Sequence, residues 1–209
     1  MFRVFVAVFY CGILTAWCYL AAAVIFLLAA ATDALDGHIA RSRNLVTNLG
    51  KFLDPIADKV LVSTAFIILL TIPTAFDAPP EFGDNILRVV AGICVALILA
   101  RELIVSGFRM IAAGKNVVLA ADKFGKIKTV FQDIAIAFLL ASMTFLTIGA
   151  MNPGYAYIPE VAQRLNALFN CGLILDYIGL VCFVICTILT VVSGVNYIVK
   201  NKQVLKDAD

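Results

Sequence analysis

Four aspartates are the residues whose type and spacing are best suited to chemistry: Asp33, Asp36, Asp54 and Asp58. The first two are three residues apart and the last two four apart, so each pair lies on one face of a helix. Four carboxylates at the ends of apolar helices repel one another and resist desolvation. Two divalent cations would relieve that repulsion, and carboxylate oxygens favour Mg²⁺ or Mn²⁺. The pattern therefore predicts a two-metal site for phosphoryl transfer.

Small residues and one arginine accompany the aspartates. Gly37, Ala40 and Gly50 remove side-chain bulk, which would let a nucleotide or a phosphate approach the backbone. Arg41 lies beside the carboxylates and is suited to pair with a phosphate through two hydrogen bonds. A single aspartate here could be only a solvated loop charge or a helix-end stabiliser. The whole ordered set of positions favours a site.

Long uncharged runs predict the elements that must position these residues. Of the 209 residues, 63% are hydrophobic and 14% are charged, against about a quarter charged in soluble domains. Asp, Glu, Lys and Arg are absent from residues 4–32, 60–76, 134–159 and 177–199. A membrane-spanning helix needs about 20 apolar residues. We therefore expect an all-α, polytopic integral membrane protein with a single domain over residues 1–209.

Six helices are expected, at residues 2–16, 19–42, 53–75, 85–113, 124–150 and 172–200. The run 4–32 is long for one span and short for two. It is either one long tilted helix or two helices of which the first is cut short. We favour two helices, with a turn in the segment Cys11–Leu20.

Basic residues predict the orientation in the membrane. Twelve of the sixteen Lys and Arg residues fall in segments 36–59 and 109–128 and in the C-terminal tail. In a six-helix protein these segments lie on one side, and the positive-inside rule makes that side cytoplasmic. Both termini and the aspartates are then expected at the cytoplasmic face. The formal net charge of +2 gives no reason to expect a nucleic-acid partner.

A second group of charges lies downstream and consists of Arg101, Arg109, Lys126 and Lys128. Charges within apolar helices cost about 2.5–3.5 kcal/mol each at the helix centre, so they need a reason. Together these four would suit a substrate that carries its own phosphate. Alternatively, Arg101 simply pairs with Glu102 or with an aspartate.

The stretch from Asp33 to Asp58 resembles the signature of the CDP-alcohol phosphotransferase family, D-x2-D-G-x2-A-R-x8-G-x3-D-x3-D, at every position. This resemblance implies an integral membrane enzyme, usually of six helices, that transfers a phosphatidyl or related group from a CDP-linked donor to an alcohol and releases CMP. It implies that the four aspartates hold the two metals and that Asp58 is the general base. It also implies a cytidine pocket at Gly37, Ala40 and Gly50, with Arg41 on the donor phosphates.

One branch of that family is more similar than the others. Segments Thr47–Lys59, Arg101–Arg109 and Gly125–Thr129 resemble bacterial phosphatidylglycerophosphate synthases. The resemblance implies CDP-diacylglycerol as donor, sn-glycerol 3-phosphate as acceptor and a homodimer in the inner membrane. Members of this branch usually carry an amphipathic segment before the first span. This sequence starts at Met1-Phe-Arg, so its N-terminus is expected to be short, through a misassigned start or a tolerated short helix.

Other functions remain open on the residues alone. An enzyme of the same family could use inositol phosphate or serine, although serine has no phosphate to occupy Arg109, Lys126 and Lys128. A metal-ion transporter would also place acids in membrane helices, but along a path across the bilayer rather than at one boundary. A non-catalytic scaffold, left by a shortened N-terminus, is the third alternative.

Overall fold

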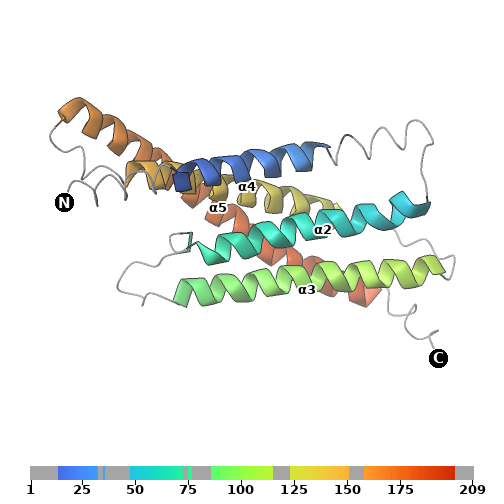
Figure 1. Cartoon of the computed structure of the whole chain (residues 1–209). Helices are drawn as coiled ribbons and strands as arrows, with labels where there is room; N and C mark the ends of the chain where they lie inside the picture. Colours follow the sequence, from blue (N-terminus) through green and yellow to red (C-terminus); the bar gives the residue numbers. More distant parts are fainter. Residues whose placement is uncertain are drawn as a thin grey trace. The chain divides into compact units, whose positions relative to one another are not determined.

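The computed structural model describes residues 14–32, 35, 48–72, 75–76, 86–114, 123–150 and 158–200, and these residues are helical with short turns (Figure 1). The helices are an N-terminal helix (Leu14–Thr32), α2 (Asn48–Thr71), α3 (Ile86–Gly114), α4 (Lys123–Gly149) and α5 (Pro159–Lys200). The all-α class predicted from the sequence is confirmed.

Four helices in the described part of the chain are long and apolar enough to cross a membrane. The spans are Leu14–Thr32, Ile86–Arg109, Ile127–Gly149 and Pro159–Tyr197, and α2 adds a shorter apolar stretch, Lys59–Thr71. Many large apolar side chains on these helices are exposed, among them Ile67 and Ile93, as expected for contact with lipid. The protein is therefore a membrane protein. The count of six helices stays a prediction, as does the single domain.

The helix boundaries agree with the sequence in part. α3 and α4 start and end within one residue of their predicted limits. The break predicted between residues 16 and 19 is wrong, because the N-terminal helix runs unbroken from Leu14 to Thr32 with no Gly or Pro inside it. α2 starts at Asn48 rather than at residue 53, and ends at Thr71, two residues before Pro73.

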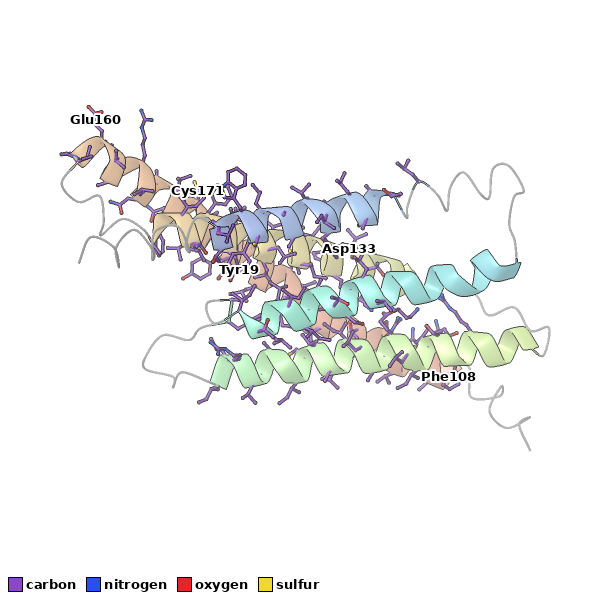
Figure 2. The ribbon with its side chains drawn as sticks, in the orientation of Figure 1. Tyr19, Phe108, Asp133, Glu160 and Cys171 are labelled. Carbon is purple, nitrogen blue, oxygen red and sulfur yellow. The ribbon has the colours of Figure 1, made fainter. Side chains whose placement is uncertain are left out.

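The last helix is much longer than predicted. α5 starts at Pro159 rather than at residue 172 and has 42 residues. Pro is preferred in the first helical turn, and the acidic Glu160 there complements the helix dipole (Figure 2). The prediction relied on uncharged runs, and the polar residues between Pro159 and Gly172 concealed the helical segment.

The chain divides into two compact units. The first comprises Met1–Val46 with Ile134–Val181. Within it, α4 and α5 pack antiparallel, and two glycines of α5 lie close to α4. A Cβ on Gly172 would lie 2.9 Å from the Leu146 nitrogen, and one on Gly179 would lie 2.8 Å from Leu139 Cγ. Between these contacts, the Ser142 hydroxyl donates to Asp176 Oδ1 at 3.2 Å. Small residues and a polar pair of this kind hold membrane helices together.

This packing predicts opposite effects for the same substitution at two glycines. Gly179→Ala should lower the free energy of unfolding by about 1–3 kcal/mol, because the new methyl group overlaps Leu139. Gly92→Ala, in α3, is the matched control: no atom of the described residues lies within 4 Å of its Cβ position, and alanine favours helix over glycine by about 1 kcal/mol. Thermal unfolding in detergent measures both. A stable Gly179→Ala variant would contradict the close packing.

The second unit comprises Thr47–Asp133 with Cys182–Asp209. Phe183 of α5 packs against Phe66 of α2, with ring centroids 5.7 Å apart, and against Phe76, at 5.6 Å. Further along, Phe108 of α3 meets the Tyr197 ring edge-on at 6.2 Å. These aromatic contacts fix α2 and α3 against the end of α5, and the start of α4 completes the same unit. The charged residues of the downstream group lie here.

Candidate functional site

Helix α2 carries the second aspartate pair. Asp54 and Asp58 lie in one unbroken helix, so their backbone positions are one turn apart, about 6 Å along the axis. Gly50 lies in the first turn of the same helix. Asp33, Asp36, Gly37, Ala40 and Arg41 lie outside the described residues, as do the side chains of Asp54 and Asp58. The helical spacing and the carboxylate donors fit a hard divalent cation.

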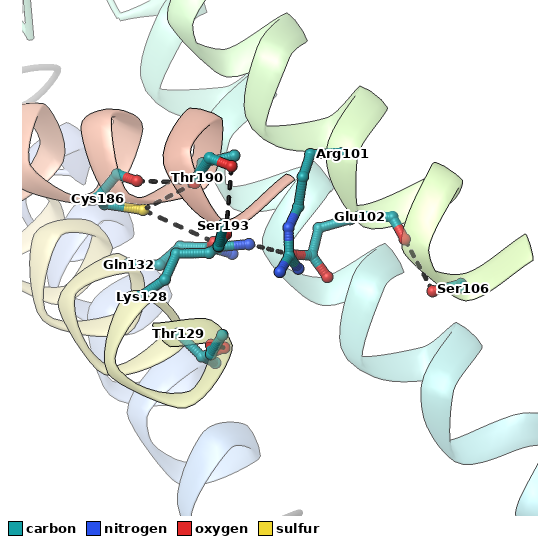
Figure 3. Close-up of polar contacts among 10 residues, drawn as sticks. Arg101, Glu102, Ser106, Lys128, Thr129, Gln132, Cys186, Thr190 and Ser193 are labelled. Atoms are coloured by element: carbon teal, nitrogen blue, oxygen red, sulfur yellow. Dashed lines mark hydrogen bonds and ion pairs between the residues drawn. The ribbon is translucent and has the colours of Figure 1, made fainter. Parts of the chain in front are cut away.

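Two of the four downstream cations, Arg101 and Lys128, meet at Glu102 of α3 (Figure 3). The Lys128 ammonium, from α4, donates to Glu102 Oε1, and the Arg101 guanidinium donates to the same oxygen at 3.2 Å. Lys128 is 1% exposed, whereas the Glu102 side chain keeps 21% of its surface. A lysine this deeply buried needs a charged partner. The pairing of Arg101 with Glu102, left open by the sequence, is confirmed.

Two glycines make room for the Arg101 side chain. A Cβ on Gly194 of α5 would lie 3.1 Å from Arg101 Cγ, and one on Gly125 of α4 would lie 3.5 Å from a terminal guanidinium nitrogen. Arg101 therefore passes close to the backbones of α4 and α5. Its Nε is buried with no hydrogen-bond partner among the described residues.

Other polar side chains surround this charged group. The Cys186 thiol lies 3.8 Å from Gln132 Oε1, and the Thr190 and Ser193 hydroxyls donate to carbonyls of their own helix, at 2.7 and 3.2 Å. The Ser106 hydroxyl caps the Glu102 carbonyl in the same way, at 2.8 Å. Burial of polar atoms among apolar helices is tolerated because they have these partners.

A pocket of about 110 Å³ opens beside Glu102, among α2, α3 and α4. Five polar residues line it: Lys59, Ser63, Glu102, Thr129 and Gln132. Its apolar lining consists of Val62, Leu99 and Leu103. Val62 follows Asp58 by four residues, as Asp58 follows Asp54, so the pocket adjoins the same face of α2 as the aspartate pair.

The four basic residues predicted to bind an acceptor phosphate differ in their surroundings. Arg101 and Lys128 come together on Glu102. Arg109 lies in α3 two turns beyond Arg101 and is exposed. Lys126 lies in the first turn of α4, and its side chain is outside the described part.

Glu102 is the residue whose importance the sequence reasoning missed. It was considered only as a neighbour of Arg101, although its main partner, Lys128, is 26 residues away. A signal was available, because a carboxylate in an apolar run needs a cation, and Lys128 lies near the start of the next predicted helix, 124–150. Ser63, Thr129 and Gln132 carry no such signal, because uncharged polar residues are common in membrane helices.

Comparison with known proteins gives a family and several relatives. The model of the CDP-alcohol phosphatidyltransferase family matches residues 1–159. A Bacillus subtilis protein is 47% identical over 122 residues, which cover 58% of this chain and 55% of that protein. A Rickettsia felis protein is 33% identical over 175 residues, covering 84% and 75% respectively. An Escherichia coli K12 protein is 38% identical over 146 residues, covering 65% and 68%.

All three relatives carry the name CDP-diacylglycerol–glycerol-3-phosphate 3-phosphatidyltransferase. The chain spans about half the length of the Bacillus protein and three quarters of the Rickettsia protein. No solved structure matches this chain significantly.

Proposed function

Because this chain belongs to the CDP-alcohol phosphatidyltransferase family, we propose that it transfers the phosphatidyl group of CDP-diacylglycerol to sn-glycerol 3-phosphate, giving phosphatidylglycerophosphate and CMP in phospholipid biosynthesis. One observation carries the proposal: the family match over residues 1–159 includes the complete aspartate motif. The shared name of the three relatives supports the choice of donor and acceptor.

The aspartates form the metal site of the proposed enzyme. Asp33, Asp36, Asp54 and Asp58 hold two Mg²⁺ or Mn²⁺ ions, and the helical spacing of the last two in α2 supports this assignment. The bound ions would neutralise the donor diphosphate and the charge that develops on the leaving group. Carboxylates are the ligands that such ions prefer.

The donor lies against the small residues of the same motif. Gly37, Ala40 and Gly50 leave space for the cytidine, and Arg41 donates hydrogen bonds to the donor phosphates. The acyl chains stay in the bilayer, next to the apolar side chains exposed on the helices. The headgroup and the tails of the lipid donor are thus bound in surroundings that match their polarity.

Asp58 acts as the general base. It takes the proton from the primary hydroxyl of the acceptor, and that oxygen attacks the phosphatidyl phosphorus. The bond from phosphorus to the bridging oxygen breaks, and CMP leaves with the electron pair. The group of Arg101, Arg109, Lys126 and Lys128 attracts the acceptor phosphate and so orients the hydroxyl.

The enzyme is placed in the inner membrane, with the site and both termini at the cytoplasmic face. The basic residues of segments 36–59 and 109–128 and of the tail support this orientation through the positive-inside rule. CDP-diacylglycerol and membrane lipids are its lipid partners, and a homodimer is the expected assembly.

The test is CMP release by the purified protein in detergent or vesicles, with CDP-diacylglycerol and Mg²⁺. Glycerol 3-phosphate should support release, whereas inositol phosphate, serine and no acceptor should not. Chelation of the metal with EDTA should abolish release, and Mg²⁺ or Mn²⁺ should restore it, because the carboxylate site depends on a cation. Release with inositol phosphate or serine alone would reassign the acceptor, and no release with any acceptor would overturn the transferase function.

A further inference from the structure

The three glycines of α5 face different neighbours. Gly172 and Gly179 lie against leucines of α4, so these two glycines allow close packing of apolar helices. The Cβ position of Gly194 instead lies 3.1 Å from Arg101 Cγ and 4.0 Å from Arg101 Cβ. Among the described residues, and apart from the neighbours of Gly194 along α5, only Arg101 comes within 4 Å of that position. Gly194 is therefore matched to one charged side chain.

Glycine at position 194 is unfavourable for the helix itself. Glycine has no side chain to pack, and it loses more backbone freedom on folding than any other residue. An alanine methyl group here would lie 3.1 Å from Arg101 Cγ, closer than the optimal separation of about 3.5–4.0 Å between carbon atoms. A larger side chain would have to displace the stem of the arginine. The missing side chain at position 194 is thus what leaves room for that stem.

The other end of the Arg101 side chain is confined as well. Arg101 Nη1 donates to Glu102 Oε1 at 3.2 Å, and the Cβ position of Gly125 lies 3.5 Å from Nη2. Only 13% of the side-chain surface of Arg101 is exposed. Arginine carries five N–H donors in a rigid plane, and Nε has no partner among the described residues. Because the plane is rigid, a shift of the stem moves the remaining donors with it.

The helix that makes this room lies outside the family match. The family model matches residues 1–159, and α5 runs from Pro159 to Lys200. Arg101, in α3, lies inside the matched region. The surroundings of a charged residue from the matched region are therefore completed by a helix beyond that region.

We propose that Gly194 is a positioning residue of the proposed transferase: it lets the stem of Arg101 lie against α5, and so fixes where the guanidinium presents its donors to the acceptor phosphate. The inference rests on the proposed function, in which Arg101 attracts that phosphate, and it gives α5 a part in acceptor binding. Gly194 itself does not touch the substrate. It acts through Arg101, because a hydrogen bond from a guanidinium to a phosphate depends on the position of its planar donors.

The test is the KM of Gly194→Val for each substrate. KM for glycerol 3-phosphate should rise about fivefold or more. The upper limit is the rise expected for Arg101→Ala, about 10–150-fold, the worth of a hydrogen bond to a charged group. KM for CDP-diacylglycerol should stay unchanged, because Arg101 is not assigned to the donor. KM does not depend on the fraction of enzyme that is folded, so partial unfolding alone would leave both values unchanged.

Gly92→Val, in the same helix as Arg101, is the matched control. No atom of the described residues lies within 4 Å of its Cβ position, so neither KM should change. An unchanged KM for glycerol 3-phosphate in Gly194→Val, or an equal rise for both substrates, would overturn the inference and leave the transferase function intact.

The double variant Arg101→Ala/Gly194→Val separates positioning of the arginine from a general packing role. Alanine at position 101 has no Cγ, so the valine at position 194 no longer overlaps the stem. KM for glycerol 3-phosphate should then equal that of Arg101→Ala alone. A further rise in the double variant would show that Gly194 acts through some other residue, and the inference would be wrong.

Thermal unfolding in detergent decides the matter if Gly194→Val gives no active protein. Gly194→Val should lower Tm in the unmodified background, because the valine overlaps Arg101. The same change should not lower Tm in the Arg101→Ala background, because valine is less unfavourable than glycine in a helix. A lower Tm in both backgrounds would overturn the inference. Absence of CMP release from the unmodified protein would instead overturn the proposed function, and with it the role of Arg101 on which the inference rests.

Discussion

Asp58→Asn is expected to lower kcat for CMP release by about 10²–10⁴-fold, the usual worth of a general base. The amide cannot accept the proton of the acceptor hydroxyl, although it keeps the size of the side chain. Asp58 lies in an unbroken stretch of α2, so the substitution should leave the helix intact. The measurement is the steady-state rate of CMP release with saturating CDP-diacylglycerol and glycerol 3-phosphate.

Asp54→Asn, one turn earlier in α2, separates loss of the base from loss of a metal ligand. A variant that has lost only one metal ligand should regain activity as the Mg²⁺ concentration rises, because weaker binding is overcome by mass action. Asp54→Asn should therefore recover in part, and Asp58→Asn should not. Full recovery of Asp58→Asn at high Mg²⁺ would rule out its role as the base.

The second large effect is expected on stability, from the ion pair of Glu102 and the buried Lys128. Glu102→Leu should lower the free energy of unfolding by about 3–5 kcal/mol, because it removes the partner of a lysine that is 1% exposed. Lys128→Met should lower the free energy of unfolding by a smaller amount, because Arg101 remains 3.2 Å from Glu102. The double variant Glu102→Leu/Lys128→Met should be more stable than Glu102→Leu alone, since the buried charge of Lys128 is then removed together with its partner.

Unfolding by denaturant in mixed micelles measures these differences. Arg109→Met is the control, because it removes an exposed cation from the same helix as Glu102 and should change stability by no more than about 0.5 kcal/mol. Strictly additive costs in the double variant would show that Glu102 and Lys128 do not interact in the folded protein.

The aspartate motif and the membrane class were both readable from the sequence. The motif depends only on residue types and their order, and the family match over residues 1–159 confirmed the resemblance that it suggested. An apolar run is a local property of the sequence, so the limits of α3 and α4 were predicted to within one residue. The start of α5 was missed because a helix with polar residues leaves no uncharged run.

The sequence does not identify the partners of the charged residues. Arg101 could be assigned to a phosphate, to an aspartate or to Glu102, and all three were compatible with its position in the chain. The structure shows that Arg101 shares Glu102 with Lys128, which comes from another helix. The space for the arginine comes from Gly125 and Gly194, which are far from it in sequence.

The sequence by itself determined the relative placement of Asp54 and Asp58, because helical spacing alone puts them on one face of α2. Only the tertiary structure shows which residues of other helices lie near α2. The pocket and the carboxylate of Glu102 exist because α2, α3 and α4 pack together, and because a buried lysine holds that carboxylate in place. The physical reason is that spacing along a helix is a local property, whereas an ion pair between helices depends on how the helices pack.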